Sequence, residues 1–460
     1  MIRNLSLNTI LLYNIFILLF YIWFMIKYRK SAVSLLIITL FFPGIFSDTR
    51  YFIGSTSIFN VYKIIVFVWA LLLFAKYVNH RLINRYRNVI LVFSVFSLYF
   101  FTSSLFIHQD HSMLIFSQWS KYVIPLMILF VLANKMKDNG NTELFNKLFG
   151  TLIISQIILS VVKLLIIRQN YEGLVGSITG LTGGGPGTTL PILGMIWLVV
   201  NDRLHLKGKN VWLLIGLLFI GIMTGKRAVL FLFPLYFVLF NFFVVRKRSI
   251  LQALRVFLVI LLISPAFVYL GFRLSPTLNP DNKVWGRFDL QYAINYALYY
   301  SAGTTSYKGQ IQKGKGRIGA VSLIWESLIH PNKYTPIFIR GNGLEYLTDE
   351  SFENYTNRRY FYGIDHRGSV TGFIQLVLTI GLLGTVLFML YLFLLIKNLM
   401  PYKRFRYMLF LVVFYDFIFY NSTIVQVHAL TVLLIFLMLL SQKKEIVNNN
   451  LKIINNEKIN

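Results

Sequence analysis

Apolar residues along this chain are grouped in blocks of about 20, and each block ends at a short polar segment. An apolar helix of that length crosses the hydrocarbon core of a bilayer, whereas the strands of a membrane barrel would show about 10 residues of alternating polarity. The pattern therefore predicts an all-α polytopic membrane protein with about thirteen transmembrane helices. The predicted spans are Asn8–Ile26, Ser31–Phe46, Ile58–Lys76, Asn88–Ile107, Leu114–Ala133, Lys147–Ile167, Pro186–Val200, Val211–Met223, Ala228–Val245, Gln252–Phe272, Ser369–Ile396, Phe405–Tyr420 and Thr423–Leu440.

Positive charges gather in every second connection between these spans. One set of short connections, together with the C-terminal tail, carries 25 Lys and Arg, whereas the alternate set carries only Arg3, Arg50, Arg168, Lys226 and Arg227. Because cytoplasmic loops of membrane proteins are enriched in Lys and Arg, the asymmetry predicts an outer N-terminus and a cytoplasmic C-terminus.

This topology divides the chain into four parts. Residues 1–271 are predicted to hold transmembrane helices one to ten, and residues 272–367 form one long extracytoplasmic loop. Residues 368–440 hold the last three helices, and residues 441–460, rich in Asn and Lys, are expected to be a disordered cytoplasmic tail.

The long loop is polar and rich in Gly and Tyr, but it also shows helical periodicity. Phe288, Tyr292, Tyr296 and Tyr299 share one face, as in a helix that lies at a bilayer surface. A second amphipathic helix is predicted over Ile318–Ile329. It places these apolar residues on one face: Val321, Ile324, Trp325 and Leu328.

Composition narrows the class of protein further. Of the 460 residues, 56% are hydrophobic and 13% are charged, whereas a soluble domain carries about 25% charged residues. A soluble enzyme and a disordered protein are thereby excluded. The net charge of +28 would suggest nucleic acid in a soluble protein, but membrane orientation accounts for most of it, and no nucleic-acid partner is expected. The absence of cysteine excludes disulfides, thiol catalysis and Cys-based metal sites.

The segment Gly221–Arg227 (GIMTGKR) ends in a Gly-Lys pair but is not a phosphate loop, which would need Gly at position 220 and Ser or Thr at position 227. Lys226 and Arg227 lie in a very short outer turn, where two interpretations are open. They extend to lipid phosphates, or they form an anion site with the N-terminus of the next helix.

Three other predicted outer segments combine glycine with charge. Gly173–Gly187 (GLVGSITGLTGGGPG) is either a flexible or re-entrant turn or a place of close backbone approach. Gly316–Arg317 precedes the second amphipathic helix, and Arg340–Gly343 follows it. Asp365–Arg367 ends the loop, where His366 is either a structural hydrogen-bonding residue or a base. No His, Asp and Glu cluster has metal-ligand spacing.

In order, these segments resemble motifs of the bacterial O-antigen polymerase/O-antigen ligase superfamily. Thr224–Ala228 is similar to its Thr-Gly-Ser-Arg-Gly turn. Gly316-Arg317, Leu323–Leu328 and Gly341–Gly343 resemble its Gly-Arg…Trp…Gly-x-Gly run. His366 followed by Phe373–Gly384 resembles its His-Asn…Glu-x-Gly-Leu-x-Gly segment. The chain departs from the family pattern at Lys226, Ala228, Arg367 and Thr379.

The resemblance implies a metal-independent glycosyltransferase with a GT-C-like fold and no cofactor, in the bacterial plasma (inner) membrane. Its implied partners are a polyprenyl-pyrophosphate-linked oligosaccharide, membrane lipid and a chain-length regulator protein. Fixed Arg groups would neutralise the departing pyrophosphate, and a histidine would accept the proton of the attacking sugar hydroxyl. The expected catalytic residues are His366, Arg227 and Arg317, and the expected substrate-binding residues are Lys226, Arg340, Arg367, Arg287 and Arg168.

Two further functions stay open at this point. An O-antigen ligase, which transfers finished glycan to lipid A-core, would have a nearly identical sequence signature. A lipid-linked oligosaccharide flippase or transporter belongs to another class and would show internal repeats and polar residues at mid-membrane. Neither is evident, since Asp416 is the only acidic residue within the predicted spans.

Overall fold

The structure, a computed structural model, describes most of the chain. The described residues are 7–28, 30–48, 57–137, 139–167, 175–180, 187–201, 209–224, 227–245, 258, 265, 269–273, 278–281, 283, 285–302, 306–307, 310–311, 317–344, 360–361, 364–365, 371–400, 402–419 and 428–457.

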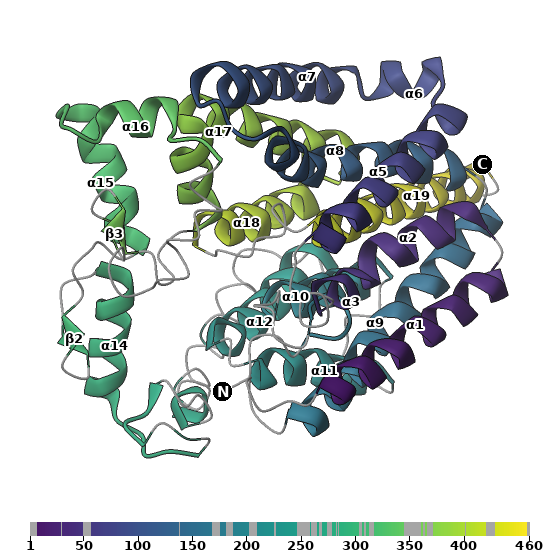
Figure 1. The fold of residues 1–460 in the computed structure, drawn as a ribbon. Coiled ribbons are helices and arrows are strands. Elements are labelled where there is room, and N and C mark those ends of the chain that lie inside the picture. The colour runs from purple at the N-terminus through teal and green to yellow at the C-terminus, as the bar shows by residue number, and fades with distance from the viewer. Residues whose placement is uncertain are drawn as a thin grey trace.

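Helices make up nearly all of the described regular structure (Figure 1). They are α1 (Leu7–Tyr28), α2 (Ser31–Phe41), α3 (Pro43–Asp48), α5 (Ser57–Tyr77), α6 (His80–Arg85), α7 (Arg87–Thr102), the π-helix η2 (Ser103–Ile107), α8 (Ser112–Lys135), α9 (Asn139–Ile167), α10 (Thr189–Val200), α11 (Lys209–Met223), α12 (Arg227–Leu239), the π-helix η3 (Phe240–Val245), α14 (Leu290–Ala302), α15 (Arg317–Ile329), α16 (Thr335–Arg340), α17 (Gly372–Leu399), α18 (Lys403–Phe419) and α19 (His428–Glu457).

The described strands are confined to two short antiparallel hairpins within residues 306–365. One pairs β1 (Ser306–Tyr307) with β2 (Gln310–Ile311). The other pairs β3 (Tyr360–Phe361) with β4 (Ile364–Asp365), which places Tyr360 opposite Asp365.

Six described helices are long and apolar enough to cross a membrane. Their apolar residues do not all face the protein interior: Leu12, Leu72 and Leu98 are each about two-thirds exposed. Such side chains on helices of this length suit contact with lipid tails, so the chain is a helical membrane protein. The six spans are Leu7–Tyr28, Ile58–Tyr77, Arg87–Ile107, Ser112–Lys135, Gly140–Ile166 and Gly372–Leu399, and the shorter apolar helices are Ser31–Phe41, Thr189–Val200, Asn210–Met223, Phe231–Val244 and His428–Gln442.

Every predicted span except one coincides with a described helix. The exception, Gln252–Phe272, lies mostly outside the described residues. The predicted span over residues 31–46 is divided into α2 and α3 at Phe42 and Pro43, and α12 continues into the π-helix η3. The predicted number of spans and their orientation stay predictions.

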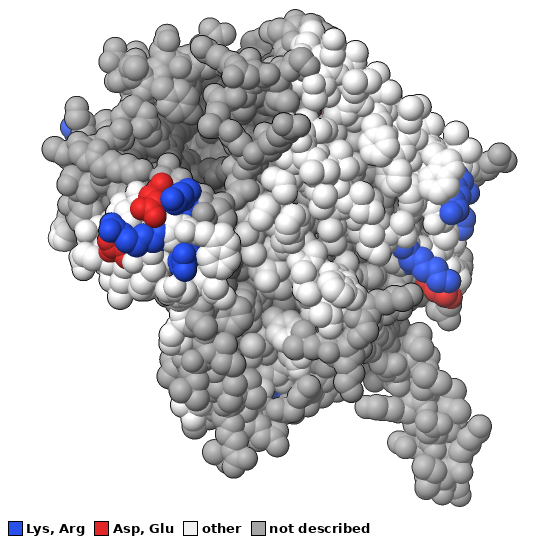
Figure 2. Space-filling model, turned by 90° about the horizontal axis from the view of Figure 1, so that it is seen from below, with Lys and Arg blue, Asp and Glu red and all other residues white. Residues whose placement is uncertain are grey.

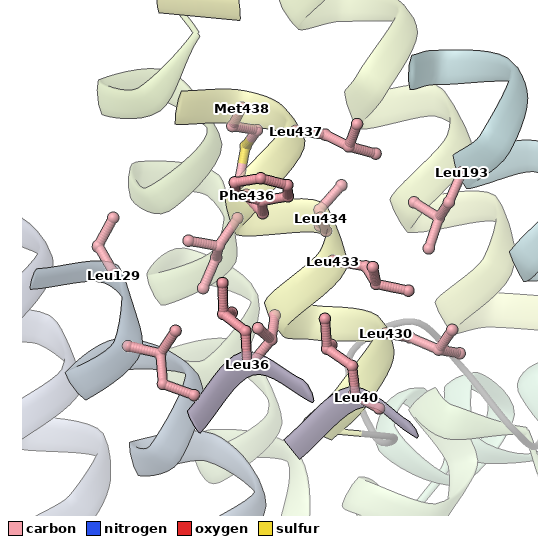
Figure 3. Packing of buried hydrophobic residues seen from close by; sticks show 14 of the residues in the cluster. Leu36, Leu40, Leu129, Leu193, Leu430, Leu433, Leu434, Phe436, Leu437 and Met438 are labelled. Carbon is pink, nitrogen blue, oxygen red and sulfur yellow. The ribbon is translucent and has the colours of Figure 1, made fainter. Parts of the chain in front are cut away.

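The centre of the core is α19. Its residues from Ala429 to Leu440 are almost all buried, as expected for a helix that is apolar on every side. Figure 3 shows its side chains packed between Leu36 and Leu40 of α2, Leu129 of α8 and Leu193 of α10. The helix continues to Glu457, through the segment for which a disordered tail was expected.

The described helices of the predicted outer loop form a column at one side of the bundle: α14 contacts α15, α15 contacts α16, and α16 packs on α17 (Figure 1). Helices occur at both positions predicted to be amphipathic. On α15 the expected face is confirmed at Ile324, which is buried, and at Val321 and Leu328, which pack against the same cluster, but Trp325 is 65% exposed. Ala320 and Ser327 are also buried, and the cluster joins α15 to Phe338 of α16 and to α17.

On the face seen in Figure 2, the described Lys, Arg, Asp and Glu residues lie mainly in two groups on opposite sides of the view, with uncharged described residues between them. Uncharged surface of this kind suits contact with lipid tails.

Candidate functional site

Arg317 is the first residue of α15, and its guanidinium joins the loop to the helix bundle. Its Nη1 donates a hydrogen bond to the carbonyl oxygen of Phe419, the last residue of α18, at 2.9 Å. Carbonyl groups at a helix C-terminus carry partial negative charge and lack partners within the helix, so a guanidinium is stabilised there. Arg317, expected to be catalytic, therefore lies where the loop contacts the end of α18.

The segment that follows α16 docks on a break in α17. The backbone N–H of Asn342 donates to the carbonyl of Leu378 at 2.7 Å, and that of Gly343 donates to the carbonyl of Thr379 at 3.1 Å. These bonds use carbonyl groups that an unbroken α17 would pair with its own next turn. The motif Gly341–Gly343 and the motif Ile380–Gly384, separated by 37 positions from Gly343 to Ile380, therefore lie at the same backbone contact.

Glycine is required on both sides of this contact. Gly341 has φ +86° and Gly381 has φ +75°, in the left-handed region that side chains disfavour. A β-carbon on Gly381 would meet the carbonyl oxygen of Ile339, and one on Gly341 would meet that of Thr379. The two backbones therefore approach more closely than any other residue type permits.

Tyr99 of α7 and two residues of the connection between η2 and α8 complete this junction. The carboxylate of Asp110, which is 6% exposed, accepts a hydrogen bond from the backbone N–H of Leu344 at 2.8 Å. Nε2 of His108 lies 3.3 Å from the carbonyl oxygen of Arg340, and the Tyr99 hydroxyl donates to the carbonyl of Ile380 at 3.1 Å. We call this set of contacts the docking junction; it comprises residues 339–344, Leu378–Gly381, Tyr99, His108 and Asp110.

Arg340 contributes its backbone to the docking junction, and its side chain is exposed. In the sequence Asp110 is an isolated acid of a short connection, and neither Asp110 nor His108 was among the expected site residues. No local signal identifies them, because their partners lie more than 200 positions away in the chain.

A second contact between predicted motifs joins the glycine-rich segment to the turn between α11 and α12. Thr224 is buried, and its hydroxyl donates to the carbonyl of Gly221 at 2.8 Å. Gly187, the last residue of the glycine-rich segment, packs so closely on Thr224 that a β-carbon there would meet Oγ1 of that side chain. The described end of the glycine-rich segment therefore packs beside the turn that precedes α12, which begins at Arg227.

Residues 175–180 of the glycine-rich segment are held by a buried polar network. Nε2 of Gln156 donates to the Tyr21 hydroxyl at 2.7 Å, and Oε1 of Gln156 accepts from the backbone N–H of Ser177 at 2.9 Å. The Tyr21 and Ser177 hydroxyls are 3.1 Å apart. The Tyr13 hydroxyl donates to the carbonyl of Gly176 at 3.1 Å.

A buried lysine completes this network from α9. Nζ of Lys163 donates to the carbonyl of Thr179 at 2.6 Å and to that of Gly180 at 3.3 Å. It also interacts electrostatically with Asp48, which is fully buried and accepts a hydrogen bond from Asn14 at 3.4 Å. Of the two interpretations of the glycine-rich segment, the described part fits close backbone approach to the bundle.

Arg287 lies in an exposed turn before α14. Its backbone N–H donates to Oδ2 of Asp281 at 2.7 Å. The same turn is closed by Arg273, whose Nε donates to the carbonyl of Gly286 at 3.2 Å and whose guanidinium lies 5.2 Å from the ring centroid of Trp285. Arg273 was not among the expected site residues.

Several expected site residues lie outside the described residues: His366, Arg367, Lys226 and Arg168. The backbone of Arg227 is described, but its side chain is not. Their predicted roles therefore stay predictions. Within the described part of the chain, no group of three or more His, Cys, Asp or Glu residues lies close enough to hold a metal ion.

No family model, no curated protein and no solved structure matches this chain.

Proposed function

We propose that this chain is a polysaccharide polymerase of the bacterial plasma membrane. It would transfer a growing O-antigen or capsule glycan from polyprenyl pyrophosphate to a lipid-linked repeat unit on the outer face. The observation that carries the proposal is the contact between Arg317 and Phe419, because it holds a cationic part of the loop against the membrane helices. A pyrophosphate attached to a membrane lipid would lie at that boundary.

The proposed topology has thirteen spans, an outer N-terminus and a cytoplasmic C-terminus. In this orientation the docking junction, the start of α12 and the end of α18 all face the outer side. The loop cations and the helix N-terminus at Arg227 would then act on the same bilayer surface.

The reaction is a displacement at an anomeric carbon. A hydroxyl oxygen of the incoming repeat unit forms a bond to the anomeric carbon of the growing chain. The bond from that carbon to the pyrophosphate oxygen breaks, and polyprenyl pyrophosphate leaves with the electron pair. Positive charges of Arg227 and Arg317 would stabilise the negative charge that grows on the leaving group.

The hydroxyl proton needs an acceptor, and His366 is the proposed base, since imidazole changes protonation near neutral pH. Its positive neighbour Arg367 favours the neutral, proton-accepting form. Lys226, Arg340, Arg287 and Arg168 are the proposed contacts to phosphate and sugar oxygens. Membrane lipid and a chain-length regulator protein are the further partners that the proposal includes.

The test uses purified protein with a synthetic lipid-linked repeat unit and neither nucleotide nor metal. A polymerase produces a ladder of longer lipid-linked chains, and Arg227→Ala and Arg317→Ala reduce that ladder at equal membrane expression. A flippase or transporter produces no longer chains in this assay, which would exclude the proposal.

Deletion in the native host separates polymerase from ligase. Loss of a polymerase leaves single repeat units, whereas loss of a ligase leaves long polymer on the lipid carrier. Accumulated carrier-linked polymer in the deletion strain would therefore replace this proposal by the ligase.

A further inference from the structure

Two lysines that the proposed mechanism does not use lie on neighbouring helices of the bundle, Lys63 buried and Lys121 partly buried. Lys63, on α5, is 7% exposed, and its Nζ donates a hydrogen bond to Oγ of Ser117 on α8 at 2.6 Å. The same ammonium group lies 4.7 Å from the ring centroid of Phe59. Lys121 is one helical turn beyond Ser117 on α8 and donates to Oε1 of Gln118.

Lys63 and Lys121 interact electrostatically with each other. His428, the first residue of α19, is 7% exposed and interacts electrostatically with both lysines. Its ring lies 6.5 Å from that of Tyr62 and hydrogen-bonds to the backbone of Thr39. These residues, which we call the buried basic cluster, come from four helices, of which α2 and α8 pack on each other and on both α5 and α19.

The buried basic cluster has no matching negative charge among the described residues. Neither lysine forms an ion pair there, and the only described ion pair joins Lys147 to Glu143 on the surface of α9. The undescribed segments that immediately precede α5 and α19, residues 49–56 and 420–427, contain no Asp or Glu in their sequence.

The buried basic cluster also contains a polar atom that points to a ligand. Thr39 is fully buried, and its Oγ1 has no hydrogen-bond partner within the described structure. A buried hydroxyl without a partner is unfavourable, and so is a buried cation without a counter-charge. Ionisable groups persist inside membrane bundles mainly where they serve a function. An anion bound by the lysines would supply the counter-charge that the described residues lack.

We infer that the buried basic cluster binds a phosphate-class anion, with Lys63 and Lys121 as its charged donors. In the proposed topology the N-terminal ends of α5, α8 and α19 face the outer side, so the site would open toward the same bilayer surface as the docking junction. Pyrophosphate on a polyprenyl lipid and free inorganic pyrophosphate share this chemistry. The lipid as the source rests on the proposed function, whereas the anion site rests on the buried basic cluster alone.

The test measures thermal unfolding of the full-length protein in detergent with undecaprenyl pyrophosphate, inorganic pyrophosphate or uncharged undecaprenol. We expect the pyrophosphate lipid to raise Tm in a concentration-dependent way and undecaprenol to leave it unchanged. Inorganic pyrophosphate distinguishes the two sources of the anion. If its apparent Kd is comparable to that of the pyrophosphate lipid, the free anion is sufficient for binding. If its apparent Kd is much weaker, the site binds the lipid-linked form. Both results support an anion site.

The variants Lys63→Met and Lys121→Met keep the length of the side chain and remove its charge. Because an apolar group replaces a charge that is buried at Lys63 and partly buried at Lys121, we expect the Tm of the unliganded protein to stay equal or rise. The apparent Kd for pyrophosphate should weaken by about tenfold to a hundredfold for each variant, as for loss of one charged hydrogen bond. Lys63→Arg should retain binding, and Lys147→Met, in the exposed ion pair, should change neither quantity.

Three results would overturn the inference: no Tm shift with any pyrophosphate, unchanged affinity in both Met variants, or a lower Tm of both unliganded variants with affinity retained. The last pattern is that of lysines with a structural role only. If the protein binds pyrophosphate through these lysines but extends no glycan, the proposed polymerase function is wrong and the anion site is still supported.

Discussion

The guanidinium of Arg317 donates a hydrogen bond to the carbonyl oxygen of Phe419 across 102 positions of sequence, at 2.9 Å. This bond joins the start of the second loop helix to the end of α18. It gives Arg317 a positioning role in the loop, in addition to the charge that the proposed function assigns to it.

Replacing Arg317 by Ala should release this end of the loop and reduce polymer length. Loss of a charged hydrogen bond costs about 1.5–3 kcal/mol, so residues near α15 should be cleaved faster in limited proteolysis. Arg317→Lys keeps the charge without the planar fork and should recover part of both properties. Lys283→Ala, at an exposed side chain of the same loop, serves as the control. Equal cleavage of Arg317→Ala and wild type would contradict the positioning role.

Gly381 and Gly341 should tolerate no side chain. Each combines a positive φ with a backbone carbonyl in the place of the missing β-carbon. Gly381→Ala and Gly341→Ala should each destabilise the protein by about 1–3 kcal/mol, seen as a lower Tm in detergent. Gly140→Ala, on α9 with no neighbouring atom within 4 Å of the place a β-carbon would take, should leave Tm equal or slightly higher. Equal Tm values in all three variants would exclude a close backbone contact at the docking junction.

The contact between Gly187 and Thr224 predicts coupling between two motifs 37 positions apart. Gly187→Ala alone should lower Tm, because the added methyl group meets the Thr224 side chain. Thr224→Ala removes Oγ1 and Cγ2 and should make Gly187→Ala less harmful in the double variant. A double-mutant cycle measures the coupling, which we expect at about 0.5–3 kcal/mol. Strictly additive effects would mean that the two segments do not touch.

Lys163→Met should behave in the opposite way to Lys63→Met. The Lys163 ammonium has carbonyl partners and interacts with the charge of Asp48, so its removal takes a positive charge away from a buried carboxylate and leaves the two carbonyl groups without this donor. We expect a loss of about 3–5 kcal/mol and a clearly lower Tm at unchanged detergent and pH. If Lys163→Met were as stable as wild type, the buried polar network would not be what holds residues 175–180.

The natural absence of cysteine makes the predicted topology directly measurable. Single cysteines at Ser322, exposed on α15, and at Asn84, exposed on α6, should label differently in intact cells. A membrane-impermeant maleimide should react with Ser322→Cys from outside and should reach Asn84→Cys only after the membrane is permeabilised. The reverse pattern would invert the proposed orientation and remove the loop from the outer surface.

Local sequence was sufficient to locate the helices but not their contacts. Apolar blocks of about 20 residues coincide with described helices from α1 to α19, because length and apolarity are properties of each segment by itself. The periodicity of residues 318–329 likewise predicted α15. It identified the buried face only in part: Ile324 is buried with Ala320 against α16 and α17, whereas Trp325 is exposed.

The sequence by itself determined a basic, polytopic helical membrane protein with one long polar loop and glycine-rich breaks. Only the tertiary structure decided which polar groups meet. Asp110 pairs with Leu344 across 234 positions, and Tyr99 bonds to Ile380 across 281. No periodicity or spacing connects such pairs, because they form when distant helices pack and their buried polar groups must find partners away from water.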